Sequence, residues 1–284
     1  MVKQIELADG VTQWQSPAAL VNCTVLEADD ELVVVDTLLR PQDTREVAAH
    51  IRKLGKPVRW LVNTHWHSDH CYGNRFLAHD RTCVVAHDDH LATLRRERHV
   101  LSPGRRNIVE REHLVMPHLT LRQPVCIARP LELRLLPAPG HTPDSIVIYD
   151  PARKLLITGD CVLNSGDGAH IAVPYFYWGH SGDYIASLEN LLTLDIQTVI
   201  PGHGAACGAE VMERGLTYLR NLRRLVAEYM AAHTHDWERY DMENSGILAS
   251  HCLPGTAEED FWVPQMHGLN LQRMKNELLG KDIE

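Results

Sequence analysis

HWHSDH, at residues 65–70, places three imidazoles and one carboxylate within six consecutive positions. Histidines two residues apart in a tight loop can direct ring nitrogens at one cation, and Asp69 and His70 can then serve a second cation nearby. Borderline metals such as zinc prefer these donors, and catalytic sites leave one position open for water. The segment therefore predicts a metal site.

Three further histidine or aspartate positions follow apolar stretches and are flanked by glycine, which lets the backbone turn sharply and approach closely. They occur in Gly140-His141-Thr142, Thr158-Gly159-Asp160 and Pro201-Gly202-His203-Gly204. With the first segment they give five imidazoles and two carboxylates, about the number that two four- or five-coordinate ions require. The predicted metal ligands are His65, His67, Asp69, His70, His141, Asp160 and His203.

The order of apolar stretches predicts an α/β chain. Strands are expected within 20–37 with a turn at Asp29-Asp30, and at Val58–Asn63, Thr82–Ala86, Pro124–Ala128, Leu131–Leu136, Ser145–Tyr149, Lys154–Thr158 and Thr198–Pro201. Helices are expected at 42–54, 183–194 and, interrupted, across 88–115, with an irregular segment at 161–180. We expect a catalytic core over 1–207 and a helical C-terminal extension over 208–284, packed on the same domain.

Composition limits the function classes. Of 284 residues, 44% are apolar and 23% are charged, as in soluble globular proteins, and the net charge of −9 argues against nucleic-acid binding. No leader segment or 18-residue apolar run is visible, and seven cysteines without a CxxC pair indicate a reduced chain. The sequence therefore predicts a cytoplasmic protein acting on a small molecule, with no nucleic acid or membrane as partner. The aromatic-rich tail is compatible with a homodimer.

In their order, HWHSDH, His141, Asp160 and His203 resemble the metallo-β-lactamase superfamily over roughly residues 18–205. The resemblance implies a four-layer αββα sandwich. It also implies one metal ion on His65, His67 and His141, a second on Asp69, His70 and His203, a bridging Asp160, and a role for Asp36 in orienting a histidine. Antibiotic-hydrolysing members usually lack one of these ligands, so the complete set is more similar to glyoxalase II and acyl-homoserine-lactone lactonases.

The resemblance further implies a binuclear metal-dependent hydrolase. Two divalent ions are expected, Zn²⁺ in the first place with iron or manganese as alternatives. A metal-bridging hydroxide would attack an ester, thioester or lactone, with Asp69 as the catalytic group that handles the proton. Three alternatives stay open: an iron-dependent dioxygenase or other oxidoreductase, a phosphodiesterase, and a binding protein without turnover.

Substrate choice is expected to depend on segments 161–180 and 233–268. The first contains Tyr175 and Tyr177, which are the predicted substrate-contacting residues, and the second contains Phe261, Trp262 and Met266 as pocket wall or as packing. Cys71, Cys161 and Cys207 lie beside the metal motifs. They are interpreted as structural, since neighbouring residues of an extended chain point to opposite sides.

Overall fold

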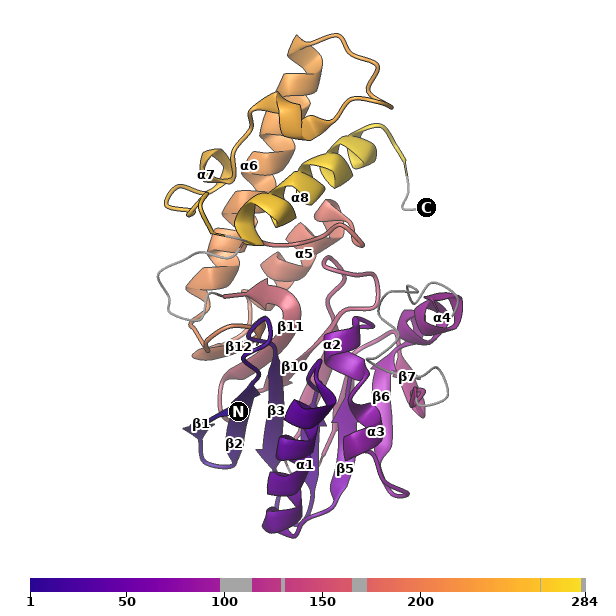
Figure 1. Cartoon of the computed structure of the whole chain (residues 1–284). Coiled ribbons are helices and arrows are strands. Elements are labelled where there is room, and N and C mark those ends of the chain that lie inside the picture. The colour runs from indigo at the N-terminus through magenta and orange to yellow at the C-terminus, as the bar shows by residue number, and fades with distance from the viewer. Residues whose placement is uncertain (98–113, 129–130, 165–172, 261, 282–284) are drawn as a thin grey trace.

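The computed structural model describes residues 1–97, 114–128, 131–164, 173–260 and 262–281, and it contains two stacked β-sheets (Figure 1). The seven-stranded sheet has the order β1 (Lys3–Ala8), β2 (Val11–Gln15), β3 (Asn22–Glu27), β4 (Leu32–Val35), β5 (Val58–Val62), β6 (Cys83–His87) and β7 (Leu119–Leu121). The five-stranded sheet has the order β12 (Thr198–His203), β11 (Leu155–Leu163), β10 (Ile146–Asp150), β9 (Leu133–Pro137) and β8 (Val125–Ile127).

The centre of the sandwich is an apolar core between the two sheets. Because side chains alternate along a strand, β-branched residues two apart point to the same face and pack together. Val33 and Val35 of β4 pack in this way in one cluster with Ile146 and Ile148 of β10. The shared cluster fixes the two sheets relative to each other, so residues at the ends of strands from both sheets can meet.

Helices cover both outer faces. On the seven-stranded sheet lie α1 (Pro41–Leu54), the single-turn helices α2 (Ser68–Cys71) and α3 (Asn74–Leu77), and α4 (Asp88–Glu97) near its far edge (Figure 1). The helix α1 begins with Pro41, buries Val47 and Ile51, and ends at Leu54. It is followed by Gly55, whose φ of 69° is the left-handed conformation that glycine adopts readily.

On the other side, the five-stranded sheet shares a second core with α5 (Ser181–Leu191), α6 (Glu210–Ala232), α7 (Ala249–Cys252) and α8 (Trp262–Leu278). A short 3₁₀ segment, η3 (Met242–Ser245), packs on α8. The predicted four-layer αββα architecture with a helical C-terminal region is therefore confirmed. The division of the chain at residue 207 stays a prediction.

The differences from the sequence-based expectation lie at edges and ends. The strands β1, β2 and β7 were not predicted, since β1 is a mostly exposed edge strand and β7 has only three residues. The strand β11 continues to Leu163 instead of ending at Thr158, which corrects the predicted start of the irregular segment. Of the helix expected over 88–115, residues 98–113 lie outside the described part. No helix in the described ranges is long and apolar enough to span a membrane.

Candidate metal centre

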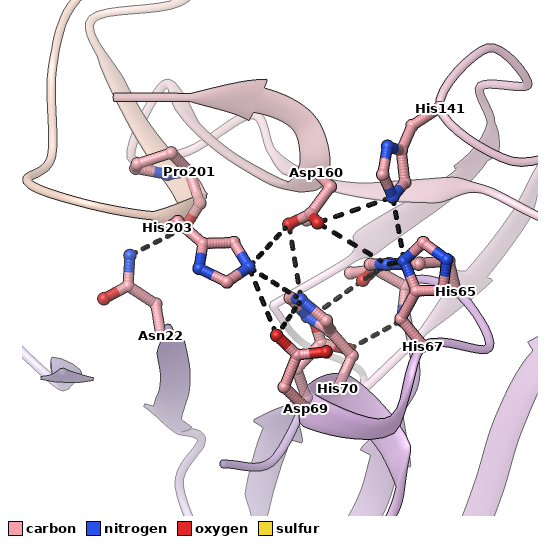
Figure 2. A network of polar contacts seen from close by, with 12 residues as sticks. Asn22, His65, His67, Asp69, His70, His141, Asp160, Pro201 and His203 are labelled. Carbon is pink, nitrogen blue, oxygen red and sulfur yellow. Dashed lines mark hydrogen bonds and ion pairs between the residues drawn. The ribbon is translucent and has the colours of Figure 1, made fainter. Parts of the chain in front are cut away.

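The seven predicted ligand residues lie together at one edge of the sandwich, where strands of both sheets end (Figure 2). The first four follow β5, His141 lies in the loop between β9 and β10, and Asp160 and His203 lie within β11 and β12. Their donor atoms form two compact groups, each with all atoms within 4.8 Å of one another: His65, His67, His141 and Asp160 in one, and Asp69, His70 and His203 in the other. The structure thus brings together seven residues that are spread over 139 positions of the sequence.

Asp160 lies between the two groups and faces both of them. Its Oδ2 is 3.7 Å from His65 Nε2 and 3.4 Å from His141 Nε2. Its Oδ1 is 3.3 Å from His70 Nε2 and 3.4 Å from His203 Nε2, yet it accepts no hydrogen bond from any described residue. A buried carboxylate oxygen without a hydrogen bond is costly, so this geometry favours positive charge beside it, from a metal ion or from a protonated imidazole.

The outer nitrogens of the histidines have partners that fix the ring protons. His141 Nδ1 donates to the Tyr175 carbonyl at 2.7 Å, and His203 Nδ1 donates to the Ala19 carbonyl at 2.8 Å. A carbonyl oxygen can only accept, so each Nδ1 carries the hydrogen. In the neutral rings the Nε2 atoms therefore present lone pairs to the centre, as metal-bound histidines do.

Asp36 fixes two more rings in the same way. Its Oδ2 accepts from His70 Nδ1 at 2.8 Å and from the Thr64 hydroxyl at 2.6 Å. Because that hydroxyl donates to Asp36, its oxygen is free to accept from His65 Nδ1, 3.1 Å away. Asp36 thus orients a histidine directly, as predicted, and a second one through Thr64.

Nitrogen lone pairs converge closely in the first group. His67 turns its Nδ1 inward, 3.0 Å from the Nε2 atoms of both His65 and His141. At most one of these contacts can be a hydrogen bond when the three rings are neutral, because only His67 Nδ1 has an unassigned proton. One cation would instead satisfy all three nitrogens.

The electrostatics of the two groups differ. In the first, burial and the neighbouring histidines lower the pKa of His67 to about 3, and burial lowers the pKa of His141. In the second, burial alone would lower the pKa of His203, but the carboxylates of Asp160 and Asp69 outweigh it and raise that pKa to about 10. The same balance, with Asp160 and Asp36 as the main carboxylates, raises the pKa of His70. The second group therefore attracts positive charge strongly.

Tight local packing holds the two late ligands. A Cβ on Gly202 would overlap Oδ1 of Asp160, so only glycine lets β12 pass this close to that carboxylate. The Asn22 amide donates to the carbonyls of Pro201 and Gly204 at 2.8 Å each, which fixes the turn around His203 (Figure 2). Asn22 and Thr64 were not singled out in the sequence, because neither has a distinguishing motif.

The three cysteines beside the motifs lie outside both donor groups. Cys71 donates to the carbonyls of Trp66 and His67, and Cys161 donates to that of Ala138. Burial raises the pKa of both Cys161 and Cys207 to about 12, so these thiols stay protonated. This agrees with the structural role expected for them.

A cavity of about 760 Å³ opens onto the metal-binding groups. Its lining contains Tyr175 but not Tyr177, which packs edge-on against Trp178 with ring centroids 5.1 Å apart. Trp262, Val263 and Met266 of α8 also line it, so part of the C-terminal segment is pocket wall. Phe261 lies outside the described residues.

Comparisons with known proteins agree with this geometry. A model of the metallo-beta-lactamase superfamily matches residues 17–203. The human acyl-coenzyme A thioesterase MBLAC2 is 28% identical over 223 residues, covering 68% of this chain and 76% of that protein. A hydroxyacylglutathione hydrolase of Rhodospirillum rubrum is 25% identical over 199 residues, covering 70% of this chain and 64% of that one.

Among solved structures, the DIM-1 metallo-beta-lactamase is similar with a TM-score of 0.63 and 23% identity, covering 77% of this chain and 97% of that one. At this identity the similarity concerns the fold alone. The curated relatives are matched over 45 to 76% of their own lengths. Their activities are therefore attributes of those proteins.

Proposed function

The chain belongs to the metallo-beta-lactamase superfamily of metal-dependent hydrolases, and we propose that it cleaves a small ester or thioester with the help of two divalent metal ions. The observation that supports this most is the pair of donor groups shared by Asp160. Four histidines have their Nδ1 hydrogens assigned to acceptors outside the centre, so four Nε2 atoms are directed inward and offer lone pairs to an ion when the rings are neutral.

The residues present fit such ions in number and in kind. Five imidazoles and two carboxylates suit zinc, although the same donor set accepts iron or manganese. His65, His67 and His141 would hold one ion, Asp69, His70 and His203 the other, and Asp160 would serve both. The carboxylate oxygen without a hydrogen bond lies on the side of the second group.

The chemistry of the reaction divides between the ions and the protein. When bound, two divalent ions at such a centre supply a water molecule activated for attack and polarise a carbonyl group. Asp69 lines the cavity, and its Oδ2 is 3.4 Å from His203 Nε2. A carboxylate there can accept the proton of the attacking water and deliver it to the leaving group.

The lining of the cavity favours a neutral acyl compound as substrate. Pro17, Leu20, Leu163, Trp262 and Met266 provide apolar surface, and no lysine or arginine occurs in the lining among the described residues. Outside the two donor groups, Asp260 is the one charged side chain in the described part of the lining. Its negative charge would repel an anionic substrate. An acyl ester or thioester fits this surface better than an anionic glutathione conjugate does.

Elemental analysis combined with a substrate panel tests the proposal. We expect about two zinc ions per chain and turnover of octanoyl esters and thioesters, above the rates for a chromogenic β-lactam and for bis-p-nitrophenyl phosphate. Turnover of the phosphodiester alone would identify a phosphodiesterase instead. Bound iron together with oxygen consumption would identify the oxidoreductase alternative.

A cytoplasmic location also stays a prediction. The seven cysteines form no disulfide.

Metal binding is expected to release protons in one of its two steps only. His67 has a pKa of about 3 and is neutral at pH 7, whereas His203, with a pKa of about 10, carries a proton there. A ligand histidine must be neutral, so the second group releases about one proton, that of His203, when it binds an ion. Because a raised pKa keeps the proton bound, affinity of that step rises with pH up to about 10.

Calorimetric titration in two buffers of different ionisation enthalpy measures this release. The first step is expected to show almost the same heat in both buffers at pH 7, and the second step a clear difference. His203→Ala should lower the number of released protons by about one. Equal proton release in both steps would show that the two groups do not differ as described.

Substitution of the α8 wall is expected to change acyl-chain preference. In the double variant Trp262→Ala with Met266→Ala, kcat/KM for an octanoyl ester should fall about tenfold while that for the acetyl ester changes less than about twofold, because only the long chain reaches this surface. Leu269→Ala is the control, since this residue is 39% exposed on the same helix and is absent from the lining. Equal losses for both esters would argue against a wall that contacts the acyl chain.

A further inference from the structure

We infer that Asn270, in the C-terminal helix α8, is a positioning residue for the metal ligand His141. The side chain of Asn270 is fully buried and reaches the segment that precedes α5. It touches no ligand itself and lies beyond the region 17–203 that matches the superfamily. Its proposed effect passes through the main chain of Pro174, Tyr175 and Phe176.

The amide of Asn270 binds both sides of Tyr175. Its Nδ2 donates to the Pro174 carbonyl at 2.6 Å, and its Oδ1 accepts from the Phe176 amide at 3.1 Å. A proline carbonyl can only accept and a backbone N–H can only donate, so the orientation of the Asn270 amide is unambiguous. The single side chain of Asn270 therefore holds the main chain on both sides of Tyr175.

The carbonyl fixed in this way is the one that orients His141. Tyr175 O accepts from His141 Nδ1 at 2.7 Å, which sets the plane of the ring and directs Nε2 toward His67. Partners of this kind raise the affinity of a metal site because they hold the ligand in place before the ion arrives. Movement of the Tyr175 carbonyl would release the ring.

Two other residues of α8 bind the same segment farther along. Arg273 Nε donates to the Gly179 carbonyl at 2.8 Å, and Glu277 accepts from the Ser181 amide at 2.8 Å. Positions 270, 273 and 277 lie on one face of a helix, and all three side chains are buried. We call Asn270, Arg273 and Glu277 the α8 polar stripe.

The segment held by the α8 polar stripe packs directly on the loop that carries His141. A Cβ on Gly179 would overlap the carbonyl oxygen of Gly140, and it would lie 2.8 Å from that of His141. With contact this close, displacement of residues 174–179 displaces the His141 loop as well. The C-terminal helix is thereby connected to the first metal-binding group. The Nδ1 atoms of His70 and His203 in the second group bind Asp36 and Ala19 instead, which lie outside this segment.

A hydrogen-bond chain behind Asn270 supplies a matched control. Asn270 Nδ2 also donates to the Tyr218 hydroxyl at 3.0 Å, which in turn donates to His267 Nδ1 at 2.8 Å. The hydroxyl must be the donor there, because His267 Nε2 donates to the Ile247 carbonyl. Tyr218→Phe removes this buried hydroxyl but leaves both bonds from Asn270 to the segment intact.

The test measures metal affinity and a ring-proton exchange rate, not turnover. It rests on the proposed function only in assuming that the first group binds an ion. Asn270→Ala should weaken zinc binding by the first group about tenfold and leave the second step unchanged, whereas Tyr218→Phe should change neither. In metal-free protein labelled with ¹⁵N-histidine, the His141 Nδ1 proton should exchange with water faster in Asn270→Ala than in Tyr218→Phe.

If Asn270→Ala does not fold, Asn270→Asp replaces it in both measurements. The aspartate keeps an acceptor for the Phe176 amide but places an oxygen against the Pro174 carbonyl oxygen in place of the donor, so a loss in the same step is expected. Equal zinc affinity and equal proton exchange in the Asn270 variants and in Tyr218→Phe would overturn the inference. If wild-type protein bound no metal, the proposed function would fail, while the exchange rate would still report on Asn270.

Discussion

Asp160→Asn is expected to leave the protein with at most one tightly bound divalent ion and to lower kcat/KM by about a thousandfold or more. Asp160 is the only described side chain whose two carboxylate oxygens face both donor groups. Asparagine has nearly the same shape but carries no charge, so two cations would have no shared counter-charge between them. The loss of a second ion removes several kcal/mol of charge stabilisation, which corresponds to about a thousandfold in rate.

Elemental analysis after dialysis and steady-state kinetics measure the two effects. Asp150→Asn is the matched control. Asp150 is another buried aspartate of the same sheet, where it accepts from the amides of Ala152 and Arg153, far from the ligands along β10. This control should lose stability and keep both ions. If Asp160→Asn retained two ions and full turnover, Asp160 would not be a shared ligand.

The metal-binding groups could be predicted because their residues carry information locally. HWHSDH lies within six positions, and glycines flank His141, Asp160 and His203, so residue type and setting both point to the same chemistry. The order of the apolar stretches predicted an α/β chain, and the αββα architecture was predicted from the resemblance that these motifs carry. Buried strands are marked by their composition, which is why β4, β5 and β10 were predicted near their true bounds.

The surroundings of the ligands could not be predicted in the same way. Asn22, Thr64 and Asn270 are single polar residues whose role depends on which main-chain groups the fold brings to them. The α8 polar stripe was missed for a related reason, because polar residues at helical spacing usually mark a solvated face. In α8, the face that carries these polar residues is buried, and so is the apolar face.

The choice between Tyr175 and Tyr177 shows the limit for loops. Both were predicted to contact substrate, since they are aromatic residues in one segment after a ligand. Of the two, only Tyr175 lines the cavity, and it contacts His141 twice: its backbone carbonyl accepts from Nδ1, and the two ring centroids are 5.7 Å apart. Which of two alternating side chains faces a cavity depends on the contacts of Pro174 and Phe176 with α8, and no local pattern reports them.

Asp69→Ala is expected to lower turnover of an alkyl ester by about 10²–10⁴-fold with the fold retained, the range typical of a lost proton-transfer group. The side chain is 21% exposed at the cavity, so its removal leaves no large void in a core. Asp69 would also hold an ion, and the two roles predict different dependence on the leaving group. A ligand acts on every substrate alike, whereas proton delivery matters little when the leaving group departs easily as an anion.

The comparison of an alkyl ester with a p-nitrophenyl ester, at saturating zinc, therefore separates the two roles. If Asp69 transfers the proton, the loss should be at least about tenfold smaller for the p-nitrophenyl ester than for the alkyl ester. Asp89→Ala, which removes an exposed aspartate 3.6 Å from His87 Nδ1, should change neither rate. Equal losses on both substrates would restrict Asp69 to metal binding, and unchanged rates on both would exclude it from the mechanism. Among the described residues, Asp69 and the shared Asp160 are the cavity-lining carboxylates beside the second group, so no third carboxylate there could replace Asp69.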